Sequence, residues 1–563
     1  MKNCLLFIAL SFSLINNACS KTGGDNPSTV NHAPVATLAA TIKSANPFTI
    51  EFKVTASDED NDALTYIWNF GEGTTKQGQA EENFTYPLNK TFTVSVDVTD
   101  GKSDPIKLST TVNTTVASVT VDASKKFQTM EGFGGFGAQD VYWSSGPFTS
   151  PDFVNTLMND LGLTILRDNI PTNFEIENDN NDPYNTDLSK YNLHNTTPGH
   201  DGKLDDHFQY LKDMKAAGLN KLIISIWSPA PWMKYNNKVG NGTTDQTSAP
   251  PYTNTPDANT NQLKTDLYEE FAEMCIAYIK IIKQETGIDV YALSLQNEPR
   301  FSQYYASCVY NGEALRDAIR VVGKRFKDEG LTTKIFMPED VGYLDGVSSM
   351  VQPALNDDSA KQYISIIAVH GYALDGVTAN SPDAQTWQTM NSWGAQYGKP
   401  LWMTETSGFS NDFKGAMDLA KAMYTAINFG NISAWLFWSL STGNLDEYCL
   451  MSSSGTKSKR YFVSKNFYRY IRPGAYRISV SAPEQTNIYP LAFKHDIENS
   501  QTIILINDNT IDKAIKLSGA GLPSQFEMYV TSEVEDCKDD GAVNTSDTVL
   551  LPASSVVTLY KKN

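Results

Sequence analysis

Eight short apolar runs constrain the fold of this chain more than any other feature of its sequence. They are Glu131–Gly137, Leu163–Ile170, Lys221–Trp227, Val290–Leu295, Thr333–Met337, Ile364–His370, Leu401–Thr404 and Ile432–Trp438. Segments between them, such as Thr265–Lys283, Gly312–Glu329 and Phe413–Asn428, carry apolar residues at helical intervals. Apolar strands that alternate with helices are typical of a parallel sheet with both faces covered. Eight such units over roughly 330 residues predict a TIM (β/α)8 barrel, whose active site lies at the carboxyl ends of the strands.

Two β-rich regions flank the predicted barrel. Before it, Phe48–Val54 and Phe92–Val98 alternate apolar and polar residues, which predicts a small β-sandwich. After it, Gln501–Ile506 and Ser555–Tyr560 alternate in the same way. This tail is too short for a large core of its own, so we expect it to pair with strand residues within Ala117–Gln128 in a side β-sandwich. The predicted domains are residues 32–116 for the first sandwich, 117–472 for the catalytic barrel with its preceding strands, and 473–563 for the side β-domain.

The first 31 residues have the pattern of an export signal. Residues 1–18 contain Lys2 and then the apolar run Leu5–Ile15, which is too short to span a bilayer and is typical of a secretory signal. Cys19 stands where a bacterial lipoprotein carries its lipidated first residue; an ordinary signal with an incidental cysteine is the alternative. Residues 19–31 read as a flexible linker. We expect an exported protein, held at the cell surface or in the periplasm by a lipid anchor only.

Composition excludes some classes of function and leaves the cysteines open. Asp and Glu number 64 against 45 Lys and Arg, a formal net charge of −19. Nucleic-acid binding, which needs a basic surface, is therefore not expected. Besides Cys4 and Cys19, the four remaining cysteines have spacings that fit no zinc pattern, and both disulfides and unpaired thiols stay open. The 27 Tyr, 26 Phe and 9 Trp suit neutral amphipathic ligands such as sugars.

Polar and aromatic side chains gather at the carboxyl ends of the expected strands. Asn297 and Glu298 follow the fourth strand and Glu405 follows the seventh, so the two glutamates face one another across the mouth of the barrel. The other strand-end residues are Arg167, Trp227, His370, Tyr372 and Trp438. Glycosidic cleavage needs such a pair of carboxyl groups, one to protonate the leaving oxygen and one to meet the anomeric carbon.

Each of these residues alone has an ordinary structural explanation. Glu405 could pair with an arginine, Trp227 and Trp438 could pack at the barrel rim, and His370 could be a core histidine with its hydrogen bonds satisfied. Their joint occurrence at the same end of the right strands favours catalysis.

At these residues the chain resembles glycoside hydrolase family 30. The matching segments, in the family's order, are Gln128–Gly135, Ile165–Arg167, Trp227–Lys234, Leu295–Pro299, Thr404–Glu405 and Asn466–Gly474. The resemblance covers residues 117–563 and implies a retaining enzyme without metal or organic cofactor. It implies that Glu298 is the acid/base, that Glu405 is the nucleophile, and that Asn297 binds the sugar 2-hydroxyl. It also implies a subsite lined by Arg167, Trp227, His370, Tyr372 and Trp438.

Elementary electrostatics agrees with these roles. A retaining pair needs carboxyl groups about 5–5.5 Å apart. We expect Glu405 to be ionised, with Arg167 nearby, and Glu298 to be protonated, because each charge raises the proton affinity of the other group.

The first sandwich resembles the PKD-type domain. The segments that carry this resemblance are Asp58–Asp62, Tyr66–Gly73 and Asn83–Tyr86, although Asn69 and Glu72 replace the two acids of the family's central motif. We expect no chemistry here. The acidic turn either holds calcium or is solvated.

The substrate is predicted less narrowly than the reaction. Tyr304–Cys308 and Lys457–Arg460 resemble the xylanase branch of the family, whereas Ser439–Thr456 lacks the arginine with which glucuronate-dependent members read an acidic side group. We expect an endo-β-glycanase that acts on a β-linked polysaccharide, with xylan ahead of β-1,6-glucan or β-1,6-galactan. The alternatives are a glucosylceramidase-type exo-β-glycosidase and a surface glycan-binding lipoprotein.

Overall fold

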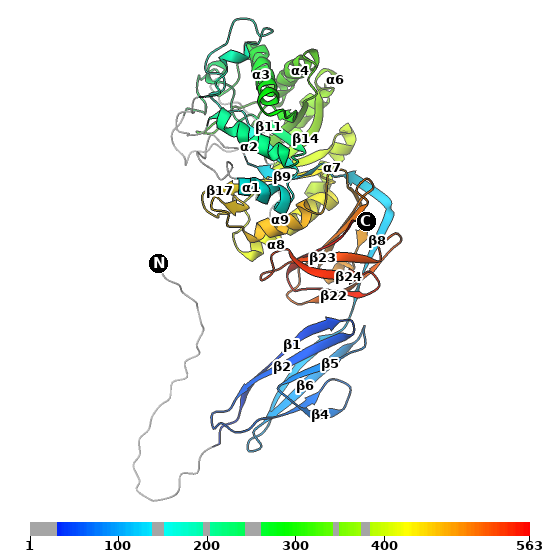
Figure 1. Ribbon diagram of the computed structural model, residues 1–563. Helices are drawn as coiled ribbons and strands as arrows, with labels where there is room; N and C mark the ends of the chain where they lie inside the picture. Colours follow the sequence, from blue (N-terminus) through cyan, green and yellow to red (C-terminus); the bar gives the residue numbers. More distant parts are fainter. Residues whose placement is uncertain are drawn as a thin grey trace, which may run out of the picture. The chain divides into compact units, whose positions relative to one another are not determined.

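The computed structural model describes residues 31–137, 151–194, 203–242, 261–341, 348–372 and 383–562. The chain divides into two compact units, the N-terminal sandwich and a larger unit that holds the barrel and the side β-domain (Figure 1). The predicted signal peptide, Cys19 and the linker as far as residue 30 lie outside the described residues. Within the described ranges, no helix is both long and apolar enough to cross a membrane.

The N-terminal unit is a sandwich of two antiparallel sheets. One sheet has the order β1 (Val35–Ala45), β2 (Phe48–Ser57), β5 (Glu81–Thr85); the other has the order β4 (Thr75–Gly78), β3 (Thr65–Asn69), β6 (Thr91–Thr99), β7 (Ile106–Asn113). Alternation along β2 and β6 buries Phe52, Val54, Val94 and Val96 between the sheets. Trp68 of β3 is fully buried, with its ring 5.8 Å from that of Phe52.

Eight parallel strands close into a barrel, which confirms the predicted fold class. In order around the barrel they are β9 (Gly132–Phe136), β10 (Ile165–Asn169), β11 (Lys221–Ser225), β12 (Val290–Ser294), β13 (Lys334–Asp340), β14 (Ile364–Gly371), β15 (Leu401–Thr406) and β16 (Ala434–Phe437). Closure comes from parallel pairing of β16 with β9. Side chains such as Ile165, Ile223, Phe336 and Trp402 fill the interior, so the strands are buried on both faces and read as continuous apolar runs.

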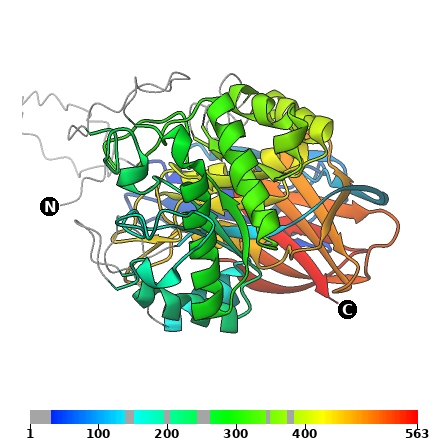
Figure 2. The same cartoon turned by 90° about the horizontal axis from the view of Figure 1, so that it is seen from above.

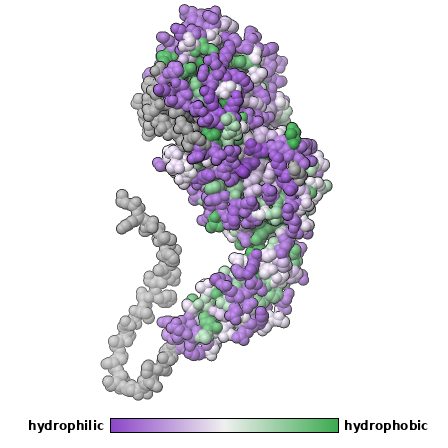
Figure 3. Space-filling view, in the orientation of Figure 1, coloured by the Kyte–Doolittle hydropathy of each residue, from purple (hydrophilic) through white to green (hydrophobic). Residues whose placement is uncertain are grey.

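Helices surround the barrel, and side-chain caps mark where some of them begin. They are α1 (Pro151–Asn155), α2 (Leu204–Ala216), α3 (Tyr268–Thr286), α4 (Gly312–Asp328), α5 (Ser348–Leu355), α6 (Asp358–Lys361), α7 (Ala384–Tyr397), α8 (Phe413–Phe429) and α9 (Lys459–Tyr468). The green helices α3 and α4 lie outside the strands (Figure 2). Asn311 caps α4 by accepting from the Ala314 backbone N–H at 2.8 Å, and Asp412 caps α8 in the same way. The face in Figure 3 is mostly hydrophilic over the barrel, since the apolar helix faces point inward.

The side β-domain is one nine-stranded sheet folded over its own core. Its order is β24 (Lys538–Asn544), β23 (Gln525–Thr531), β26 (Ser555–Lys562), β21 (Ser500–Asn507), β20 (Ile488–His495), β19 (Tyr476–Ser481), β8 (Ala117–Thr129), β22 (Lys513–Ser518), β25 (Thr548–Leu551). The segment before the barrel thus pairs with the tail: β8 lies between β19 and β22. Val119 and Ile515 from one part of the sheet share a core with Phe526 and Val557 from the other, so the sheet forms two layers.

Polar contacts hold the side domain against the barrel helices. The Arg477 guanidinium donates to the side chain of Asn428 at 3.0 Å and to that of Asn431 at 2.8 Å. Asn466 of α9 donates to Thr558 at 2.8 Å. Of the two alternatives for the cysteines, the structure has unpaired thiols, because Cys275, Cys308, Cys449 and Cys537 are all buried and free.

Candidate active site

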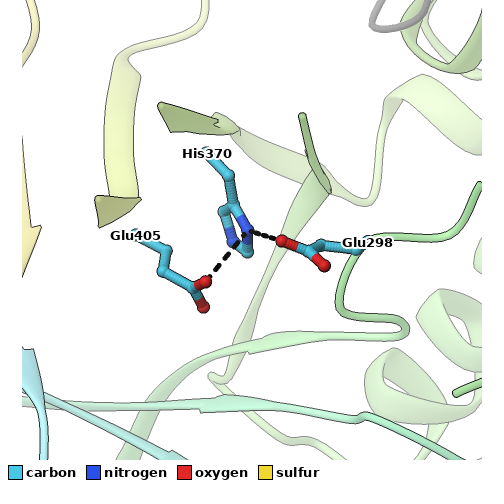
Figure 4. Close-up of side chains that lie close together, drawn as sticks. All are labelled: Glu298, His370 and Glu405. Carbon is cyan, nitrogen blue, oxygen red and sulfur yellow. Dashed lines mark hydrogen bonds and ion pairs between the residues drawn. The ribbon is translucent and has the colours of Figure 1, made fainter. Parts of the chain in front are cut away.

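Two carboxyl groups and a histidine meet at the carboxyl end of the barrel (Figure 4). Glu298 follows β12, His370 is in β14 and Glu405 is in β15. The His370 ring nitrogen Nδ1 lies 3.0 Å from Glu298 Oε1 and 3.8 Å from Glu405 Oε1. One oxygen of each glutamate and a ring nitrogen of the histidine all lie within 4.8 Å of one another. The strand-end arrangement therefore brings the two glutamates into reach of a single small ligand group.

Glu405 is held by a buried arginine and a tyrosine. Arg167, with no exposed surface, donates from Nη1 to Glu405 Oε2 at 2.6 Å and from Nη2 to Asn297 Oδ1 at 2.6 Å. The Tyr372 hydroxyl donates to the other oxygen, Glu405 Oε1. A guanidinium on one oxygen and a phenol on the other fix the orientation of this carboxyl group.

Glu298 is the carboxyl group of the pair that favours its proton. Burial raises its pKa, and the negative charge of Glu405 raises it further, while the hydrogen bond to His370 opposes both effects. Its backbone has a positive φ of 49° and its N–H donates to the Glu339 carbonyl at 2.9 Å. The left-handed conformation turns the chain sharply after β12 and directs this side chain into the mouth of the barrel.

A third carboxylate, Glu339 at the end of β13, lies beneath the pair. Its Oε1 is 3.1 Å from Arg167 Nε and 3.6 Å from His370 Nε2. Burial would raise its pKa, but Arg167 and His370 lower it to about 2. Burial would likewise lower the pKa of His370, but Glu405, Glu298 and Glu339 raise it to about 10. Arg167 and His370 thus place two positive groups among the carboxyl groups of Glu339, Glu405 and Glu298.

An aromatic cleft of about 430 Å³ opens over the carboxyl groups. The described residues that line it are Trp227, Asn297, Glu298, Phe301, Tyr304, Tyr305, Tyr372, Glu405, Trp438 and Tyr448. Trp227 and Trp438 lie with ring centroids 5.8 Å apart, and the guanidinium of Arg167 lies 4.8 Å from the centre of the Trp227 ring. Flat rings beside carboxyl groups suit a sugar, whose C–H faces pack on aromatic carbon.

Two of the predicted subsite residues are fully buried. Arg167 and His370 have no exposed surface and contact the carboxyl groups of the cleft, and their part in the subsite stays a prediction. Both are inside a strand rather than beyond its end, so their side chains project into the barrel interior. Trp227, Asn297, Tyr372 and Trp438 line the cleft.

Sequence reasoning missed Glu339 and most of the tyrosine-rich edge of the cleft. Glu339 follows the expected fifth strand within two residues of its predicted end, so the strand-end rule would have found it. Tyr448 is 45 % exposed in the segment after β16. It carried no signal, because that segment has no regular periodicity.

The His370 ring lies between the two glutamates, hydrogen-bonded to Glu298 and at ion-pair distance from Glu405 (Figure 4). The surrounding carboxyl groups raise the pKa of His370 to about 10 and so favour its protonated ring. Two carboxyl groups within reach of each other in an aromatic barrel mouth, one of them with a raised pKa, are the groups that glycosidic cleavage needs.

Comparisons with known proteins agree with this class. The glucuronoxylanase XynC of Bacillus subtilis (strain 168) is 27% identical over 313 residues, which cover 54% of this chain and 68% of that protein. A GH30 endoxylanase from Clostridium papyrosolvens C71 is 25% identical with a TM-score of 0.60, covering 79% of this chain and 100% of that chain. The endo-beta1,6-glucanase BT3312 shares the fold at 19% identity, with a TM-score of 0.57 and coverage of 89% and 100%. A PKD domain model matches residues 31–116.

The chain is therefore a glycoside hydrolase related to glycoside hydrolase family 30, and it carries a PKD domain before its barrel.

Proposed function

We propose that the protein is a retaining endo-β-glycanase with Glu298 as acid/base and Glu405 as nucleophile. The observation that carries this proposal is the short separation of the two glutamates, which have oxygens within 4.8 Å of each other. Retaining enzymes hold their carboxyl groups about 5–5.5 Å apart, whereas inverting enzymes leave about 6.5–9.5 Å for a water molecule.

The described contacts support one part for each group in the two steps of the proposed reaction. In the first, Glu405 attacks the anomeric carbon, Glu298 gives its proton to the glycosidic oxygen, and the leaving sugar departs. Formation of the glycosyl ester removes the charge of Glu405, so the pKa of Glu298 falls. In the second step Glu298 takes a proton from water, whose oxygen attacks the anomeric carbon and releases Glu405 as a carboxylate.

Asn297 suits recognition of the sugar 2-hydroxyl. Its Oδ1 accepts from Arg167 at 2.6 Å, which leaves the Nδ2 amide group to donate into the cleft. The same arginine holds Glu405, so one rigid group orients both the nucleophile and this contact.

Xylan is the substrate that we favour, and a glucuronate side group is not required. The named relatives include a glucuronoxylanase and an endoxylanase. Among the described residues that line the cleft, none is a lysine or arginine that could bind a glucuronate carboxylate. Arg460, in the segment that resembles the xylanase branch, is 1% exposed and donates to the backbone carbonyls of Ser410 and Cys449.

Product analysis on several polymers tests this proposal. The purified protein is incubated with linear xylan, glucuronoxylan, β-1,6-glucan, β-1,6-galactan and an aryl β-glycoside, with Glu405→Gln as blank. We expect a ladder of oligosaccharides from both xylans at similar rates. Release of monosaccharide alone would mean an exo-glycosidase, a ladder from a β-1,6-linked polymer alone would replace xylan, and no release from any substrate would overturn the activity.

We further propose that the protein is exported and anchored through Cys19, with the PKD domain as a spacer before the barrel. The support is the sequence of residues 1–31. Cys19→Ala should move the protein from the membrane fraction to the soluble fraction, while Cys4→Ala, in the same leader, should not. Membrane retention of the Cys19→Ala protein would contradict the anchor.

A further inference from the structure

A second group of carboxylates is buried away from the catalytic pair. Glu175 and Asp179 belong to the segment between β10 and α2, and Glu270 and Glu273 lie one turn apart at the start of α3. We call these four residues the acidic cluster. Glu175 is 2% exposed, Glu270 is 8% exposed and Glu273 has no exposed surface.

Several oxygens of the acidic cluster lack hydrogen-bond partners, although Asp179 Oδ2 accepts from the Asp187 backbone N–H at 2.7 Å. Both side-chain oxygens of Glu175, both of Glu273, Oε2 of Glu270 and Oδ1 of Asp179 are buried without one, and so is the hydroxyl of the neighbouring Tyr191. A buried carboxylate without a partner is strongly unfavourable. The presence of several unpartnered carboxylate oxygens in one place therefore indicates a missing positive charge.

No side-chain cation among the described residues supplies that charge. The nearest is Arg325, which lowers the pKa of Glu273 and Glu270 from a distance. Its own hydrogen bonds go elsewhere, from Nη1 to Glu269 Oε2 at 3.2 Å and from Nη2 to the Pro183 carbonyl at 2.7 Å. Within the described ranges, no lysine, arginine or histidine forms an ion pair with any member of the cluster.

Protonation alone does not account for the acidic cluster. Burial raises the pKa of Glu175 to about 9, with added effects from the charges of Glu273, Asp179 and Glu270; burial also raises that of Glu273 to about 7. A neutral carboxylic acid still needs an acceptor for its O–H. Neither oxygen of Glu175 has a partner, so a proton there would have no acceptor.

We propose that the acidic cluster binds a divalent cation of the calcium type. Calcium takes six to eight oxygen ligands in flexible geometry, mainly carboxylates, carbonyls and water, whereas magnesium demands a tighter octahedron. Four carboxylates offer up to eight oxygens, and the adjacent stretch 177–187 is rich in Asn and Asp. No three members of the cluster place oxygens within 4.8 Å of one another, as Glu298, His370 and Glu405 do with their ligand atoms.

Calcium-dependent stability of the full-length protein tests the proposal. After treatment with chelator, 1 mM Ca²⁺ should raise the melting temperature by about 3 °C or more relative to EDTA. Glu175→Gln and Glu273→Gln should each abolish this rise. In EDTA both variants should melt no lower than the native protein, because each removes a buried like charge. Glu269→Gln changes a half-buried carboxylate that lies next to the cluster and pairs with Arg325, and this variant should keep the rise.

A second variant and a direct probe distinguish the other outcomes. Asp58, Asp62 and Asp100 also group their oxygens within 4.8 Å in the PKD domain, so Asp62→Asn is tested in parallel. If the rise in melting temperature persists in Glu175→Gln and Glu273→Gln but is lost in Asp62→Asn, the cation binds in the PKD domain. That result would overturn the proposal. Absence of any rise in the native protein overturns it as well. Tb³⁺ luminescence excited through tyrosine should appear in the native protein and be halved or more in Glu175→Gln; equal signals would contradict the site.

Discussion

The larger unit contains two buried groups of acids, and they differ in what surrounds them. At the barrel mouth, Glu405 and Glu339 share Arg167 and His370 at distances of 2.6–3.8 Å. In the acidic cluster, both side-chain oxygens of Glu175 are buried without a hydrogen-bond partner, and no ion pair among the described residues reaches Glu175 or Glu273. The side chains are the same, but one group carries its own compensating charge and the other requires it from outside.

This difference separates two uses of a buried carboxylate. Arg167 and Tyr372 hold the Glu405 carboxyl group in one orientation, which suits a nucleophile, and burial raises the pKa of Glu298, which suits an acid. Buried carboxylates without a compensating cation destabilise the folded protein, and a cation that binds them raises its stability. Substitutions in the two groups should therefore have opposite effects on stability.

The largest expected effect is on turnover by Glu405→Gln. Loss of the proposed nucleophile should lower kcat by about 10⁴-fold or more, because the amide cannot form the glycosyl ester. Steady-state assays on xylo-oligosaccharides measure the effect, and circular dichroism checks the fold. Glu447→Gln, an exposed acid after β16, is the matched control and should stay within about twofold. Turnover of Glu405→Gln within tenfold of native would contradict the role.

Arg167→Met tests compensation at the barrel mouth. This change leaves Glu405 and Glu339 as buried anions without their shared cation, so the free energy of unfolding should fall by about 3–5 kcal/mol. We also expect kcat to fall by about 10²-fold, since both the nucleophile and Asn297 lose their donor. Denaturant titration and kinetics measure the two effects. An unchanged midpoint would mean that Arg167 does not compensate these charges.

The His370→Asn variant tests the same network through its pH dependence. The folded pKa of His370, about 10, is raised above its unfolded value near 6.5. Its stabilising contribution is therefore complete below about pH 6.5 and is lost as pH rises toward 10. The difference in unfolding free energy between native and His370→Asn proteins should shrink between pH 6.5 and 10, as measured by urea titration. A constant difference over this range would contradict a protonated His370.

Glu175→Gln should give a smaller effect of opposite sign. In EDTA, the pKa of Glu175 in the folded state is raised to about 9. Between about pH 4.5 and 9 the group therefore ionises more readily in the unfolded state, and the folded state is increasingly disfavoured as pH rises. The variant should therefore be more stable than the native protein, by about 1–2 kcal/mol at pH 8, and the gain should grow with pH. Denaturant titrations at pH 5 and pH 8 measure it. A loss of stability at pH 8 would mean that the acidic cluster is compensated after all.

The sequence predicts the barrel well because its strands are buried on both faces. Each such strand reads as an uninterrupted apolar run, and the parallel order then places every strand end at one mouth. Glu298 and Glu405 could be expected together for this reason alone. Their catalytic roles stay predictions until the substitutions are measured.

What the sequence does not reveal depends on depth and on contacts between distant segments. Arg167 and His370 lie on the expected strands and are fully buried, and an apolar run in the sequence does not mark the residue at which the mouth of the barrel begins. Glu175 stands in a stretch of Asn, Asp and Thr that reads as solvated, and only the packing of α3, about a hundred residues later, buries it. Burial of a polar segment by a distant helix leaves no local pattern.

The most direct test of the account is to trap the covalent intermediate. The probe is a 2-deoxy-2-fluoro glycoside of the preferred sugar with an activated leaving group. It slows hydrolysis of the glycosyl ester more than its formation, so the ester accumulates. Peptide mass spectrometry of the inactivated protein should find the fluorosugar as an ester on Glu405. A label on Glu298 or Glu339 instead, or steady hydrolysis with no ester formed, would contradict a retaining mechanism with Glu405 as nucleophile.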